Sequence, residues 1–84
     1  MNTYTGVQNM NTKIIQALRW FESKSKIPAL DKARLNLLMK VDITSNPNGI
    51  PENPQTLMKL MDAMIKVLKL SDQEIQELKR ILGL

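Results

Sequence analysis

Apolar side chains cover most of the circumference of one predicted helix, the segment 57–70, which reads LMKLMDAMIKVLKL. At roughly 100° per residue, its polar side chains and that of Gln55 fall within an arc of about 80°. Apolar side chains extend over roughly 240° of the remainder, whereas an ordinary surface helix buries a stripe about 100° wide. We therefore expect this helix to lie at the centre of a bundle or at an interface between chains.

The hydrophobic pattern predicts three further helices. Segment 12–24 places Ile14, Leu18 and Phe21 on one side. Near the C-terminus, Ser71 and Glu74 have the spacing of a capping box, in which each side chain bonds to the other residue's backbone N–H. The sequence thus predicts an all-α fold, a small compact bundle of four helices at about 12–24, 29–41, 54–70 and 72–82.

The predicted second helix, 29–41, carries apolar residues on two opposite sides. We expect its main stripe to face the core, and this stripe comprises Leu30, Ala33, Leu37, Leu38 and Val41. Leu35 and Met39 lie roughly 140–180° away from Leu30, on the far side of the helix. Two of the four helices therefore present more apolar surface than their neighbours can cover, and this surplus predicts a homodimer or a larger protein partner.

Two segments fall outside the predicted helices. Residues 1–10 carry no charged side chain and no helical or strand period, so we expect a flexible N-terminal tail before a single domain at 11–84. Residues 42–53 contain the turn sequence NPNG, and prolines follow at positions 51 and 54. This pattern predicts a long loop at 42–53. Ile43 and Ile50 could attach the two ends of this loop to the core. The loop is either a packed connector or a functional element.

Composition excludes several kinds of chemistry. The 84 residues include no Cys and no His, which removes disulfides, thiolate zinc sites and the commonest general base. The three glycines are isolated, so no glycine-rich phosphate loop is present. We expect no enzyme activity, no catalytic residue, no cofactor, no metal site and no small-molecule substrate. Lysines and an aspartate interrupt the most apolar segment, and the N-terminus has no secretion signal, so we expect a cytoplasmic protein without a membrane partner.

The net charge of +4 is mild, but five basic residues surround the first helix–helix junction. These residues are Arg19, Lys24, Lys26, Lys32 and Arg34. They could attract nucleic acid or an acidic protein, or they could simply be a solvated surface. No aromatic side chains alternate with these charges, so the stacking of single-stranded bases is not indicated.

The C-terminal half, NPQTLMKLMDAMIKVLKLSDQEIQEL, is similar to the last two helices of lambda-repressor-like helix-turn-helix domains. That resemblance implies a DNA-binding fold, but the long loop stands where the family has its recognition helix. Leu68, Leu70 and the segment 71–78 also resemble the end of the golgin GRIP domain, a small helical dimer that binds a GTPase. The tyrosine expected at the start of the first helix is missing, and the insertion between helices is longer than in that family. Neither resemblance assigns the chain to a family.

The sequence therefore favours a non-enzymatic protein-interaction module, a small regulator or adaptor that binds itself or a larger protein through Leu and Met side chains. The alternative is a small nucleic-acid-binding regulator that uses the basic residues between Arg19 and Arg34. The short chain and the missing catalytic residues are also compatible with a phage or mobile-element accessory protein. The residues predicted to bind a partner are Trp20, Leu35, Met39, Met58, Met61 and Ile65. Alternatively, Trp20 covers the edge of the core, and Met58 and Met61 are core residues.

Overall fold

A computed structural model describes residues 12–84, and the predicted tail at 1–10 lies outside this range. The four expected helices are present as α1 (Thr12–Lys24), α2 (Pro28–Met39), α3 (Pro54–Leu68) and α4 (Asp72–Leu82). A short 3-10 helix, η2 (Pro47–Gly49), lies in the long loop. No strand occurs in this part of the chain, so the all-α prediction is confirmed.

The helix boundaries follow from local capping. Asn53 accepts a hydrogen bond from the backbone N–H of Thr56 at 2.8 Å, and Pro54 occupies the first turn of α3. Both bonds of the predicted capping box at the start of α4 are present, at 2.9 and 3.2 Å. Helix α2 ends two residues before the predicted position because Lys40 adopts a left-handed conformation, with φ of 60°.

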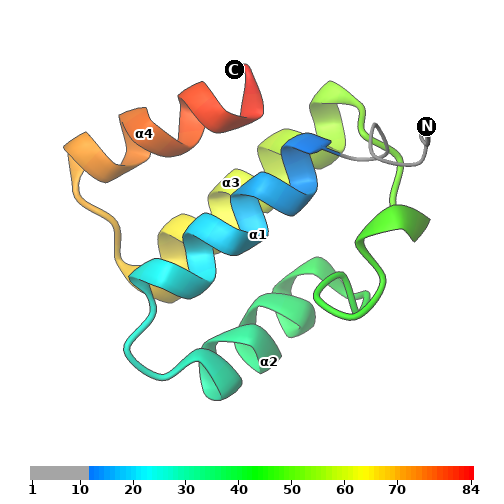
Figure 1. The fold of residues 1–84 in the computed structure, drawn as a ribbon, viewed down its shortest axis with the longest axis horizontal. Coiled ribbons are helices and arrows are strands. Elements are labelled where there is room, and N and C mark those ends of the chain that lie inside the picture. The colour runs from blue at the N-terminus through cyan, green and yellow to red at the C-terminus, as the bar shows by residue number, and fades with distance from the viewer. Residues whose placement is uncertain (1–11) are drawn as a thin grey trace, which may run out of the picture.

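The helices pack as two main pairs, α1 with α4 and α2 with α3. Figure 1 shows α1 and α3 in the middle of the bundle, with α2 and α4 on opposite sides of them. The buried core contains apolar residues from all four helices and from the loop. Its largest fully buried side chains are Ile14, Phe21, Leu35, Ile43, Leu60, Met64, Leu78 and Leu82.

The long loop is tied to the end of α2 by a polar network. Asn36 donates hydrogen bonds to Asp42 and to the Thr44 hydroxyl, both at 2.9 Å, and accepts one from the Thr44 backbone N–H. As expected, Ile43 is fully buried and Ile50 packs against the core. The loop from 42 to 50 is therefore a packed connector that covers one end of the core.

Candidate functional site

The orientation of α2 about its own axis determines which apolar side chains face solvent. Leu35 is fully buried and Met39 is 4% exposed, whereas Leu37 is 77% exposed. The expected inward stripe of α2 is therefore wrong, because the structure places the opposite side of the helix in the core. Leu35 and Met39 contribute to the chain's own core and cannot be the surface that binds a partner, as the sequence suggested.

Polar contacts on one side of α2 explain this orientation. Asp31 is buried and accepts a hydrogen bond from the Ser25 hydroxyl, which fixes the start of the helix. The next residue, Lys32, forms an ion pair with Glu22 of α1. Asn36 bonds to the loop through Asp42 and Thr44, as described above. These groups hold one side of α2 toward α1 and the loop, so its most apolar side faces solvent.

This orientation produces an apolar surface, which we call the α2 outer face. Its large side chains are all more than a third exposed: Leu30, Leu37, Leu38 and Val41. Ala33 lies among them and is also exposed. Contiguous exposed apolar groups of this kind are typical of interaction surfaces in small soluble proteins.

A groove adjoins the α2 outer face where α2 meets α3. It consists of two hollows of about 490 and 460 Å³, which share Leu38 and Lys66 as lining residues. Its apolar side chains are Leu38, Met58, Ala63 and Val67, and its charged ones are Arg34, Lys59, Asp62, Lys66 and Lys69. We call this the α2–α3 groove. Met58 is 52% exposed, so it is the one predicted partner-binding residue that the structure leaves largely open within residues 12–84.

The remaining predicted partner-binding residues are half-buried and lie outside the groove. Trp20 is half-buried, and its indole N–H donates a hydrogen bond to Glu77 of α4 at 3.2 Å. Lys24, also on α1, lies 5.7 Å from the centre of the same ring and pairs with Glu74 and Glu77 of α4. Met61 and Ile65 are half-buried on α3, and neither lines the groove. The structure thus places Trp20, Met61 and Ile65 outside the α2–α3 groove, and their role in binding a partner stays a prediction.

The five basic residues predicted to contact nucleic acid do not form one open cationic surface. Lys24 lies 3.9 and 3.6 Å from Glu74 and Glu77, and Arg34 lies 3.5 Å from Asp31. Together with the Lys32–Glu22 pair, these contacts leave Arg19 and Lys26 as the two members without an ion pair in the described part of the chain. Pairing reduces the positive potential that phosphates would meet.

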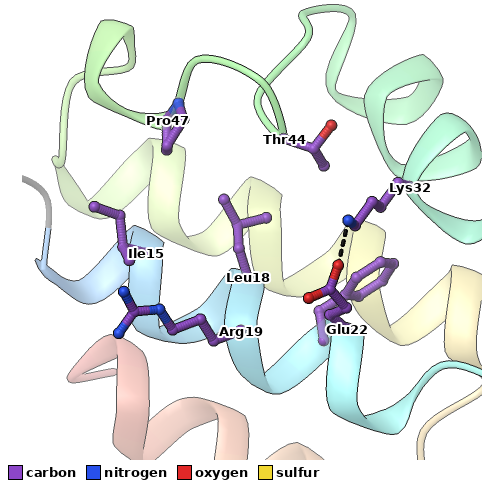
Figure 2. A pocket seen from close by; sticks show the side chains of 8 residues that line it. Ile15, Leu18, Arg19, Glu22, Lys32, Thr44 and Pro47 are labelled. Atoms are coloured by element: carbon purple, nitrogen blue, oxygen red, sulfur yellow. Dashed lines mark ion pairs between the residues drawn. The ribbon is translucent and has the colours of Figure 1, made fainter. Parts of the chain in front are cut away.

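A third, smaller hollow of about 200 Å³ lies between α1, α2 and the loop. Figure 2 shows Ile15 and Leu18 on its apolar side, Thr44 and Pro47 from the loop, and the Lys32–Glu22 ion pair at one edge. Arg19 contributes a cation at the other side. Small-molecule sites usually enclose about 300–1,000 Å³, so this hollow is too small for an ordinary ligand pocket.

The described residues contain no acidic cluster suited to a metal ion. Within the same range, none of the helices combines the length and apolarity needed to cross a membrane. Comparisons with protein-family models, curated proteins and solved structures find no significant match to this chain. The α2 outer face and the α2–α3 groove are thus identified from their exposure and charge alone.

Proposed function

We propose that this chain is a non-enzymatic protein-interaction module, and that the α2 outer face with the adjoining groove is its binding surface. The observation that carries this proposal is the exposure of Leu37 and its apolar neighbours beside a core that is already complete. Solvating these side chains is unfavourable by about 25 cal/mol for each Å² of apolar surface, and a partner that covers them recovers part of that free energy.

Site-specific photo-crosslinking tests this proposal. A benzophenone amino acid replaces Leu37 in the full chain, expressed in the cells that produce the protein. Position 76 on α4 serves as the matched control, because Gln76 is also exposed and helical but lies outside the candidate surface. We expect crosslinks from position 37 to a second copy or to one larger protein, and few from position 76. Equal crosslinking from both positions would contradict the proposal.

A further inference from the structure

The charged side chains that line the α2–α3 groove are mainly positive. Four cations line it, Arg34, Lys59, Lys66 and Lys69, against the single carboxylate of Asp62. Among residues 12–84, none of the three lysines has a carboxylate oxygen within 4.0 Å. These three cations are therefore available to an incoming group, unlike the paired basic residues at the α1–α2 junction.

The groove also has an apolar component that runs along its length. Leu38 of α2 is shared by both hollows, with Met58 at one end and Val67 at the other. The small side chain of Ala63 lies between them on α3. On α3 the apolar part of the lining, from Met58 to Val67, spans about 14 Å, which is the length of roughly two and a half turns of a helix. Apolar side chains arranged over this length can contact an amphipathic helix through side chains spaced at i, i+3/i+4 and i+7.

Building on the function proposed above, we propose that the α2–α3 groove binds an acidic amphipathic helix of a partner protein. Leucine-like side chains of that helix would contact Leu38, Met58 and Val67. Its flanking Glu or Asp side chains would face the lysines of the groove. Charge complementarity of this kind accelerates association and selects between partners, beyond the affinity that apolar burial supplies.

A second copy of the same groove does not satisfy these charges. In a two-fold symmetric dimer the same surface lies on both sides of the interface, so four cations would face four cations. Among the other carboxylates, Glu22, Glu74 and Glu77 already pair with lysines, whereas Asp42, Glu52 and Asp72 are exposed and lie outside the groove. A symmetric dimer through the groove is therefore disfavoured, and we assign the acidic helix to a different protein, even if the α2 outer face mediates self-association.

Nucleic acid also fits the groove less well than an acidic helix. Leu38, Met58 and Val67 have no favourable contact to make with phosphates, and no aromatic side chain is among the lining residues on which a base could stack. Nucleic-acid binding is therefore a separate arm of the test.

The experiment measures the binding of fluorescently labelled synthetic helical peptides to the full chain by anisotropy. One peptide places Leu at i, i+4, i+7 and i+11 with Glu on both flanks. A second peptide replaces every Glu by Lys, and a labelled single-stranded DNA and a duplex form the nucleic-acid arm. We expect the acidic peptide to bind about tenfold more tightly than the basic one, with the difference decreasing as salt rises.

Variants of the chain locate the binding site. The double variant Lys59→Glu/Lys66→Glu should weaken the acidic peptide about tenfold and strengthen the basic one. The control Arg19→Glu/Lys26→Glu changes the net charge equally, outside the groove, and should leave peptide binding nearly unchanged. Leu38→Asp should abolish binding of both peptides, and circular dichroism melts confirm that each variant is folded.

Three results would overturn this inference: equal affinity for both peptides, an equal effect of the two double variants, or DNA binding that depends on Lys59 and Lys66 without peptide binding. If position 37 crosslinks to a partner while the acidic peptide fails to bind, the interaction function stands and the acidic helix is wrong. If neither occurs, both proposals fail.

Discussion

Alanine substitutions at two neighbouring leucines of α2 test the orientation on which the candidate surface depends. Leu35 is fully buried and Leu37 is 77% exposed, although the two residues are only two positions apart on one helix. Removing a fully buried leucine side chain leaves a cavity and costs about 2–5 kcal/mol of unfolding free energy. At an exposed helical position the same substitution should change it by less than about 0.5 kcal/mol, since alanine also favours the helix.

Urea unfolding followed by far-ultraviolet circular dichroism and by the fluorescence of Trp20, the single tryptophan in the sequence, measures both variants. Small domains have unfolding free energies of about 5–15 kcal/mol, so Leu35→Ala should move the midpoint strongly or prevent folding. The milder Leu35→Val, expected to cost about 1 kcal/mol, keeps the comparison measurable. Low protein concentration removes any contribution from self-association. Equal losses at both positions, or a larger loss for Leu37→Ala, would refute the orientation of α2.

Three further predictions follow from local features of the structure. Lys40→Gly should raise the unfolding free energy by about 0.5–1 kcal/mol, because glycine adopts the left-handed conformation at φ of 60° without a side-chain clash. An unchanged or lower urea midpoint would count against that conformation of residue 40. Hydrogen bonds from the Ser71 backbone N–H and hydroxyl hold the pKa of Glu74 below its ordinary value. The ionised Glu74 carboxylate therefore stabilises the fold fully above its unfolded-state pKa, and this stabilisation is lost as the pH falls through the lower folded-state pKa. Glu74→Gln should therefore show a smaller loss of stability on acidification than the wild type, and parallel pH profiles of the urea midpoint would contradict this. Peroxide should oxidise Met58 well before Met39, as judged by peptide mass spectrometry, because Met39 is buried. Equal oxidation rates would argue against the burial of Met39 in the core.

Local signals allowed the helices to be predicted. Asn53 with Pro54 and the capping box of Ser71 with Glu74 act through neighbouring backbone groups, so their effect is encoded within a few residues. The wide apolar arc of 57–70 likewise indicated a helix with neighbours on several sides, and α3 does contact α1, α2 and α4. The fold class and approximate boundaries therefore depended on interactions that a single sequence displays.

The candidate surface depended on contacts between distant segments, and the sequence assigned it to the wrong side of α2. Counting apolar residues favoured the side with Leu30 and Leu37, but the rotation of α2 is fixed by partners outside the helix. Lys32 pairs with Glu22 of α1, and Asn36 bonds to Asp42 and Thr44 of the loop. No periodicity within 29–41 reveals these partners. The sequence therefore predicted that α2 leaves apolar side chains uncovered, but it assigned the uncovered surface to the wrong residues.

Hydroxyl-radical footprinting, applied to the purified chain and to the chain inside the cells that produce it, tests most directly whether the exposed apolar surface binds a partner. We predict that Leu37, Leu38 and Met58 are labelled readily in the purified protein and become protected in cells, while exposed residues of α4 are labelled equally in both. Equal labelling of Leu37, Leu38 and Met58 in the two preparations would show that nothing covers this surface, and the proposed interaction function would be wrong.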